Sequence, residues 1–308
     1  MAKKIKKMLP DVRHHVCIRK RDLGKALSAC EKSLELSKAV APTCTLDHEN
    51  DFDERDLVPP EDCIPKKQIF FLKTSKTGST TVAQIIARFS YNNQLKALFG
   101  EDSSGNLLFA NRTRPFNAND CYLGRDLPVS QKFDASFVHL RYDRDEVRKV
   151  MKPGFSAVSI LPSPHEFLDL FGYESLPSMF LMNHQFYFFG YPSVLLRSKE
   201  KTEYLADQWI EKISEEFDLV LIMEEMLASL AIFMLKFCWT SGDMIHFKLN
   251  SNPTKKPILS AKAKSALQEL IWADFKLYNH FKDKLHSHKE YFGVKGFVLI
   301  CQELTLQN

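Results

Sequence analysis

A polar loop of nine residues carries the side chains of this 308-residue chain that are best suited to chemistry. The loop consists of Lys73, Thr74, Ser75, Lys76, Thr77, Gly78, Ser79, Thr80 and Thr81. Ammonium groups, hydroxyls and the backbone N–H groups at the start of a helix together suit a phosphate or a sulfate. The loop is therefore predicted to bind an anion. The alternative is a plain strand–cap–helix unit, because Ser and Thr are common N-caps.

The residues on either side of the loop predict the elements that position it. Ile69–Leu72 is an apolar run typical of a buried strand, and Val82, Ile85, Ile86 and Phe89 recur at the spacing of a helix. Further strand-like runs are 137–140, 157–161 and 219–222, and helical patterns cover 79–90, 143–151, 203–216, 224–238 and 260–283. This alternation predicts an α/β fold with a central parallel sheet flanked by helices.

The same topology predicts where a ligand binds. Parallel α/β sheets bind ligands beyond the carboxyl ends of their strands. We therefore expect the loop at 73–81, the segment after His139 and the segment after Leu161 to share one edge of the sheet. The loop is not the P-loop of nucleotide triphosphatases, which requires G-x-x-x-x-G-K-[ST], because here both lysines precede the only glycine.

Composition favours a packed globular protein and argues against some partners. Hydrophobic residues make up 44% of the chain, and the net charge is only +4. The basic residues are spread along the sequence, which gives no case for nucleic-acid binding. Seven cysteines without metal-type spacing suit neither a zinc site nor a clear disulfide framework, although an oxidising compartment would allow one or two disulfides.

The first part of the chain lacks the pattern of a core. Residues 1–25 are rich in Lys and Arg, and residues 47–62 are rich in Asp and Glu. We predict a charged, poorly ordered or peripheral extension at 1–65 and one domain at 66–308. The basic start fits a solvated tail or, alternatively, a contact with an anionic membrane surface. No transmembrane run and no secretory signal is visible.

Five sequence blocks, in order, resemble the galactose-3-O-sulfotransferase family. The blocks are FLKTSKTGSTTVAQIIARF, FVHLRYDRDEVRKVMKPG, FDLVLIMEEMLASLAIFMLKFCW, IHFKLN and LSAKAKSALQELIWADFKLYNHF. The resemblance covers about residues 66–285 and implies a P-loop-like sulfotransferase fold. It also implies a sulfuryl donor, PAPS (3′-phosphoadenylyl sulfate), and an acceptor that ends in galactose, either a galactosylceramide-like glycolipid or a glycan.

The resemblance implies roles for the residues of the loop. Sulfuryl transfer needs an anion site, a cation on the leaving phosphate oxygen and a base, but no metal. Lys76 matches the family's loop lysine and would stabilise charge on the leaving phosphate, while Lys73 is a secondary candidate. The 5′-phosphate would receive hydrogen bonds from Thr77, Gly78, Ser79, Thr80 and Thr81.

Three residues of the second block are further candidates. His139 would act as the general base, because a neutral imidazole accepts a proton near neutral pH. The alternative for His139 is a core histidine in a strand. Arg141 and Arg144 fit acceptor or cofactor binding as well as they fit solvated charges at the start of a helix.

One cofactor element departs from the family pattern. Sulfotransferases generally hold the 3′-phosphate of PAPS with an arginine after the third strand and a serine on the following helix. Here Pro162 stands in place of the arginine and Leu170 in place of the serine. Loss of one charge-assisted hydrogen bond, about 1.5–3 kcal/mol, weakens binding by about one to two decades. Nearby groups that would compensate are Ser163, His165, Lys199 and, under a shifted alignment, Arg197.

The sequence therefore supports two functional hypotheses. The first is a PAPS-dependent galactose 3-O-sulfotransferase, and the alternative is a degenerate family member that binds glycan or nucleotide without transferase activity. Family members are Golgi membrane proteins with an N-terminal anchor, and the resemblance implies that location although this chain shows no anchor. Asn111-Arg112-Thr113 is a glycosylation sequon, which fits a glycoprotein.

Overall fold

The computed structural model of the protein describes residues 63–74, 77–98, 114–121, 130–165, 183–196, 198–246 and 261–291. Within these residues the centre of the molecule is a five-stranded parallel sheet with the order β2-β3-β1-β4-β5. The strands are β1 Ile69–Leu72, β2 Ala97–Leu98, β3 Ala135–Ser136, β4 Ser156–Leu161 and β5 Leu219–Ile222. The predicted α/β fold with a central parallel sheet is therefore confirmed.

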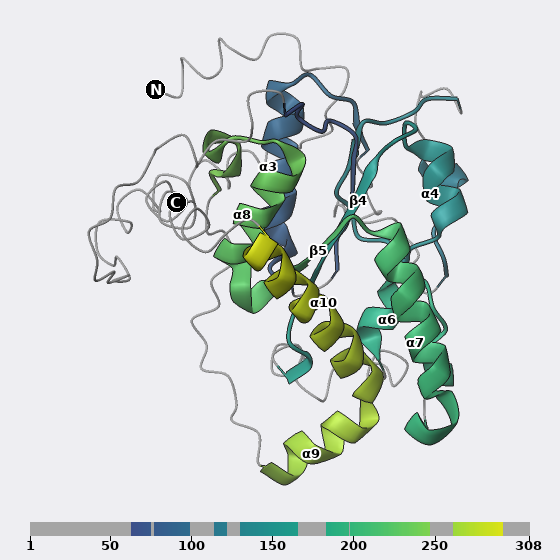
Figure 1. Cartoon of the computed structure of the whole chain (residues 1–308). Coiled ribbons are helices and arrows are strands. Elements are labelled where there is room, and N and C mark those ends of the chain that lie inside the picture. Colours follow the sequence, from purple (N-terminus) through teal and green to yellow (C-terminus); the bar gives the residue numbers. More distant parts are fainter. Residues whose placement is uncertain are drawn as a thin grey trace, which may run out of the picture.

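Helices cover both faces of the sheet (Figure 1). The α-helices are α3 Ser79–Asn92, α4 Arg144–Val150, α6 His184–Phe188, α7 Lys199–Glu216, α8 Met226–Phe237, α9 Ala261–Leu270 and α10 Trp272–Tyr291. The 3₁₀ turns are Ala118–Cys121, Ser193–Leu195, Met223–Glu225 and Ser241–Met244. Figure 1 shows α3 and α8 on one side of the sheet and α4 and α7 on the other. Helix α10 contacts the edge strand β5 together with both α7 and α8.

The central strands form because their side chains are buried on both faces. Every residue of β1, β4 and β5 is buried, which is the pattern of a parallel sheet covered by two layers of helices. β1 pairs with β4 from Ile69 opposite Ser156 to Leu72 opposite Ser159. This register places the end of β1 in the middle of the sheet, between β3 and β4.

Most of the predicted elements are confirmed, and two predictions are wrong. The strand predicted at 137–140 instead spans Ala135–Ser136, because the apolar side chains that follow are buried without continuing the ladder. The helix predicted at 260–283 is two helices that meet at Ile271. Predictions for 69–72, 157–161 and 219–222 as strands, and for 79–90, 143–151, 203–216 and 224–238 as helices, match the structure to within a few residues.

A reciprocal pair of caps explains why a new helix begins at Trp272. Asn183 Oδ1 accepts from the backbone N–H groups of Ala273 and Asp274, at 3.1 Å each, in the first turn of α10. The Asp274 carboxylate in turn accepts from the first turn of α6, at 3.0 Å from Gln185 N and 3.3 Å from Phe186 N. Each helix therefore supplies the side chain that satisfies the unpaired N–H groups of the other.

A disulfide joins the start of the described chain to the end of α8. Cys63 and Cys238 are bonded, with their Cα atoms 5.6 Å apart. Beside it, Lys66 N donates to Phe237 O and Trp239 Nε1 donates to Lys66 O, both at 3.0 Å. The segment that leads into β1 is thus fixed covalently and by hydrogen bonds against α8.

Several predictions for the N-terminal region stay untested. Residues 1–62 and the sequon at 111–113 lie outside the described residues, so the domain boundary at residue 65 stays a prediction. Among the helices that the structure describes, none is long and apolar enough to cross a membrane.

Asp274 is expected to make the stability of the fold depend on pH. Burial raises the pKa of this carboxyl from 3.8 to about 7, against the opposing effect of its backbone hydrogen bonds. Between these values the folded state holds a proton that the unfolded state has released. The contribution of Asp274 to the free energy of unfolding is therefore complete below the unfolded pKa, and it is lost as the pH rises through about 7.

The matched variant is Asp274→Asn, whose amide does not titrate. We expect the Tm of the wild type to fall relative to that of the variant between about pH 5 and about pH 8. Thermal unfolding of both proteins at the two pH values measures this difference. A difference in Tm that does not change with pH contradicts the assignment.

Candidate active site

The carboxyl edge of the sheet brings the predicted site segments together. β3, β1 and β4 are parallel neighbours, so the residues that follow them emerge at one edge. Thr74 Oγ1, after β1, donates to Ile160 O at 3.0 Å. His139 Nδ1, after β3, lies 2.8 Å from Lys73 O. The prediction that these segments share one edge is confirmed.

The hydroxyls of the loop hold its own conformation. Thr77 Oγ1 and Ser79 Oγ both donate to Thr74 O, at 3.2 and 2.7 Å. All three residues are buried. The hydroxyls of Thr77 and Ser79 therefore satisfy a buried carbonyl, and among the described residues of the loop Thr80 and Thr81 are half-buried.

Gly78 allows the turn that opens α3. Its φ of 66° lies in the left-handed region, where a side chain adds strain. A Cβ at this position would also lie 2.9 Å from Met226 Cε and 3.3 Å from Met223 Cγ. No side chain caps α3, and no acidic residue occupies its first turn. The first N–H groups of the helix and its positive dipole end thus remain for an anion.

The structure describes only one of the two lysines in the loop. Lys76 and Ser75 lie outside the described residues, so the role predicted for Lys76 stays a prediction. Lys73 follows β1 directly and is half-buried, and burial lowers the pKa of its ammonium group. No described carboxylate offsets this effect of burial on Lys73. A cation without an acidic partner beside the start of α3 favours anion binding further.

The hydrogen bond of His139 defines its tautomer. A backbone carbonyl can only accept, so Nδ1 carries the proton when it contacts Lys73 O at 2.8 Å. In the neutral ring, Nε2 is then the nitrogen that takes up a proton. The contact also fixes the ring against the residue that begins the loop. The arrangement places an oriented imidazole next to the loop that leads into α3.

The segment after β4 is closed by contacts within the protein. Pro162 O accepts from Gln185 Nε2 at 2.9 Å. Ser163 N donates to Glu224 Oε1 at 2.6 Å, and Glu224 Oε2 accepts from Tyr278 OH at 3.1 Å. The Glu224 carboxylate therefore already accepts the backbone N–H of the residue that follows Pro162. Ser163 N is thus used within the protein, whereas no side chain caps the first N–H groups of α3.

The groups that would compensate for Pro162 have other partners. His165 lies against the ring of Phe275, with centroids 4.7 Å apart, and its Nε2 is 3.3 Å from Gln268 Nε2. Lys199 is 4.0 Å from Glu203. Leu170 and Arg197 lie outside the described residues, so no compensation by Arg197 is tested.

The two arginines of the second block differ in their surroundings. Arg141 Nη2 donates to Gly190 O at 3.2 Å, and its guanidinium lies 4.5 Å from the centre of the Tyr187 ring. Arg144 forms an ion pair with Glu216 of α7 at 3.3 Å. Arg144 therefore links α4 to α7, while Arg141 stays on the segment that continues from His139.

Sequence reasoning missed three polar residues near this edge, namely Gln185, Glu224 and Tyr278. Glu224 is the second residue after β5, so the rule that places ligands at strand ends was a usable signal. Gln185 and Tyr278 belong to α6 and α10, and only packing between distant segments brings them here. Gln185 Oε1 is buried and has no hydrogen-bond partner among the described residues.

The described residues show no group of three His, Cys, Asp or Glu side chains that could hold a metal ion.

Comparisons with known proteins agree on one family. A family model described as galactose-3-O-sulfotransferase matches residues 16–176 and 161–305. Galactosylceramide sulfotransferase from Mus musculus is 26% identical over 286 residues, which cover 80% of this chain and 63% of the relative. Galactose-3-O-sulfotransferase 2 from Mus musculus is 26% identical over 259 residues, covering 70% of this chain and 61% of the relative. Galactose-3-O-sulfotransferase 3 from Homo sapiens is 26% identical over 251 residues, covering 71% and 56%. The chain thus spans about three fifths of the length of these relatives.

Gly78→Ala tests the close packing of the loop. We expect a loss of about 1–2 kcal/mol in the free energy of unfolding from the left-handed backbone alone. The 3.3 Å approach to Met223 Cγ adds a further loss, whereas Met226 Cε is the end of a flexible side chain and can move aside. Gly154→Ala is the matched control, because Gly154 has φ +79° but nothing within 4 Å of an added Cβ. Chemical denaturation measures both, and equal losses would show that the two methionines do not restrict position 78.

Proposed function

The chain belongs to the galactose-3-O-sulfotransferase family, and from this premise we propose that it transfers a sulfuryl group from PAPS to the 3-hydroxyl of a galactose. The acceptor would be a galactose-terminated glycolipid of the galactosylceramide kind, or a glycan. The observation that supports this most is the His139 Nδ1 contact with Lys73 O, which sets an oriented neutral base beside an anion-binding loop. The names of the relatives favour a transferase over the non-catalytic alternative.

The loop before α3 would hold the donor. PAPS supplies the sulfuryl group as a phosphosulfate anhydride, so its reacting end is a pair of anionic groups. The N–H groups from Thr77 to Thr80 and the hydroxyl of Thr81 would receive the 5′-phosphate at the positive end of the helix dipole, because Thr81 N already donates to Gly78 O at 3.0 Å. Lys76 would stabilise the charge that builds on the leaving phosphate oxygen, and Lys73 would add a second cation.

His139 would handle the proton of the acceptor. As the new bond forms between the galactose oxygen and sulfur, the bond from sulfur to the phosphate oxygen breaks. Nε2 of His139 takes the hydroxyl proton at this stage, because Nδ1 already carries one. The imidazolium that results is stabilised by its hydrogen bond to Lys73 O. Positioning and charge stabilisation supply the rest of the catalysis, with no metal.

The proposal extends to the secretory route. Disulfides persist in oxidising compartments, and the Cys63–Cys238 bond fits such a compartment. We propose a Golgi membrane or lumenal location, with the acceptor presented from a membrane glycolipid or a glycoprotein.

Variants of His139 and Lys76 test the assigned roles. His139→Asn keeps a side-chain N–H near the position of Nδ1 but provides no base, so we expect kcat to fall by about 10²–10⁴. Lys76→Ala is expected to reduce turnover in the same range, because the leaving oxygen loses its cation. Lys67→Ala, an exposed lysine before β1, is the matched control.

The assay is sulfate transfer from PAPS to a galactose-terminated acceptor, with circular dichroism as the check on folding. Near-normal turnover in both His139→Asn and Lys76→Ala would rule out these roles.

The affinity for PAP (3′-phosphoadenosine 5′-phosphate), the molecule that PAPS becomes after it loses its sulfuryl group, tests the segment after β4, where Pro162 replaces the family's arginine. PAP and AMP differ only in the 3′-phosphate. Because Pro162 offers no side-chain donor and Glu224 occupies Ser163 N, we expect PAP to bind less than about tenfold more tightly than AMP. Calorimetry of both nucleotides measures the ratio. A preference of about a hundredfold or more would mean that another cation holds the 3′-phosphate.

A further inference from the structure

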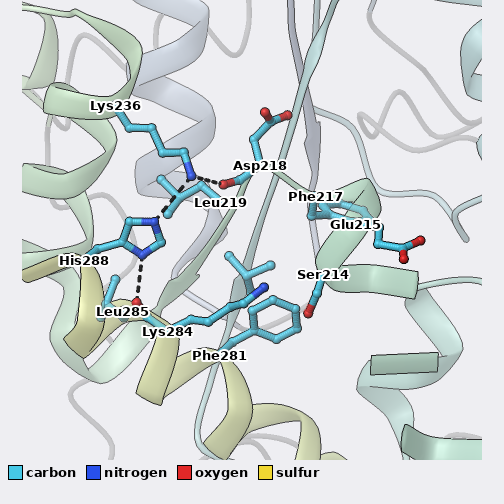
Figure 2. A pocket seen from close by; sticks show the side chains of 11 residues that line it. Ser214, Glu215, Phe217, Asp218, Leu219, Lys236, Phe281, Lys284, Leu285 and His288 are labelled. Atoms are coloured by element: carbon cyan, nitrogen blue, oxygen red, sulfur yellow. Dashed lines mark hydrogen bonds between the residues drawn. The ribbon is translucent and has the colours of Figure 1, made fainter. Parts of the chain in front are cut away.

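A cavity of about 430 Å³ lies beside the start of β5, and Figure 2 shows the side chains that line it. Asp218, Leu219 and Val220 line it at the start of β5, whereas the candidate site lies beyond the carboxyl ends of the strands. The rest of the lining comes from the end of α7, the end of α8 and the second half of α10. The cavity is therefore separate from the loop that binds the donor.

Three basic side chains from two helices gather in this cavity. Lys236 comes from α8, and Lys284 and His288 come from α10. Lys236 Nζ donates to Asp218 O at 2.6 Å and lies 3.4 Å from His288 Nε2. His288 Nδ1 is 2.7 Å from Lys284 O, so this nitrogen carries the proton and Nε2 accepts from Lys236. The imidazole is thus neutral beside two ammonium groups.

The described residues do not neutralise this cluster. Glu215 and Asp218 are the acidic residues in the lining, and neither forms an ion pair with Lys236 or Lys284 within 4.0 Å. Asp218 instead accepts from Ala157 N at 2.9 Å and lies 4.0 Å from Lys66. Asp218 still attracts Lys236 at longer range, but not as a contact partner.

Burial lowers the pKa of all three basic groups, and repulsion between like charges adds to this effect for Lys236 and His288. Burial lowers the pKa of Lys236, and Lys66 and Lys284 lower it further. Burial likewise lowers the pKa of Lys284. The pKa of His288 is lowered first by burial and then by the charges of Lys236 and Lys284. The cavity therefore holds positive charge at a cost that an anion would relieve.

A purely structural explanation covers only part of the cluster. Cations near the ends of α7 and α8 offset the negative ends of their dipoles, and Lys236 caps the carbonyl of Asp218. Lys284 caps no carbonyl among the described residues: its Nζ lies over the Phe281 ring, 5.7 Å from the centre, and no described carboxylate pairs with it. Its charge is left facing the cavity, as Figure 2 shows.

We propose that this cavity binds the phosphate or sulfate group of a small soluble molecule, held by Lys236, Lys284 and His288. Two ammonium groups and an imidazole supply the donors that a tetrahedral dianion needs. The volume exceeds that of one such group, and the apolar wall of Leu219 and Phe281 suits the organic part of a phosphate or sulfate ester. When the anion binds, His288 takes up a proton and Nε2 turns from acceptor to donor.

The first test compares the stabilisation by inorganic phosphate and by inorganic sulfate in three proteins. They are the wild type, Lys284→Gln and the control Lys212→Gln, which removes the same charge from an exposed position on α7. Lys284 is chosen because its ammonium group makes no described ion pair, so its loss should leave the fold intact. Chloride keeps the ionic strength constant.

For a millimolar site, about 10 mM phosphate should raise the Tm of the wild type and of Lys212→Gln by about 3 °C. At least half of this rise should be lost in Lys284→Gln. The donor loop also accepts phosphate, and it contributes equally to all three proteins. An equal rise in Tm in all three proteins, or none in the wild type, overturns the proposal.

The second test reads the cavity directly and does not depend on a variant. Nitrogen NMR of the histidine rings follows His288 in the wild-type protein as phosphate is added. Lys236 and Lys284 are the charged groups that act on His288, and Asp218 and Glu215 are the acidic residues of the cavity lining. A bound dianion should outweigh the two lysines and raise the pKa of His288. A Tm rise without a change at His288 would place the anion elsewhere and overturn the proposal.

A third experiment asks whether the anion is instead the head group of a membrane lipid. Vesicles of phosphatidic acid in phosphatidylcholine present the same group on a surface. Binding to these vesicles without any response to inorganic phosphate would overturn the assignment to a soluble ligand. None of these measurements uses PAPS or turnover, so their outcome is independent of the proposed transferase activity.

Discussion

The buried carbonyl of Thr74 fixes the conformation on which the candidate site depends. It accepts the hydroxyls of Thr77 and Ser79, and the hydroxyl of Thr74 itself reaches Ile160 O on β4. A buried carbonyl without a donor would cost about 1–3 kcal/mol, so these contacts hold the loop firmly. The side-chain hydroxyls are used within the protein, and the backbone N–H groups are what the loop offers. The hydroxyl-rich sequence thus builds a site whose donors are mainly backbone.

Charge is placed at both edges of the sheet, with different consequences. At the carboxyl edge, the start of α3 has no cap and Lys73 has no acidic partner among the described residues. Farther along the same edge, Glu224 meets the backbone after β4 and disfavours a second anion. At the amino edge, Lys236 and Lys284 crowd a neutral His288. The net charge of the chain is only +4, but its charges are concentrated at these two edges of the sheet.

The sequence predicts those parts of the fold that depend on local pattern. The apolar runs of β1, β4 and β5 and the helical spacing of α3 locate the loop and its edge of the sheet. Residues that are buried beside a sheet and residues that pair within it are equally apolar in the sequence. The pattern therefore predicts a strand at 137–140, two residues after the true start of β3 at Ala135. The break at Ile271 depends on Asn183, which lies 90 residues from Ala273 and has no local signal. His139 was identified through the family resemblance, whereas Gln185 and Tyr278 join the site through contacts that no spacing reveals.

The Cys63–Cys238 bond closes a covalent ring that contains the whole of the described sheet. β1 through β5, α3 and the loop that begins it all lie between the two cysteines in the sequence. A protease that cuts once inside this ring leaves a single covalently joined molecule, and the strands on the two sides of the cut cannot diffuse apart. Helix α10, which covers β5, lies outside the ring, so after a single cut between residue 238 and α10 only its non-covalent contacts among the described residues hold it on the sheet. Trimming that leaves the ring intact is therefore confined to the segments before residue 63 and after residue 238.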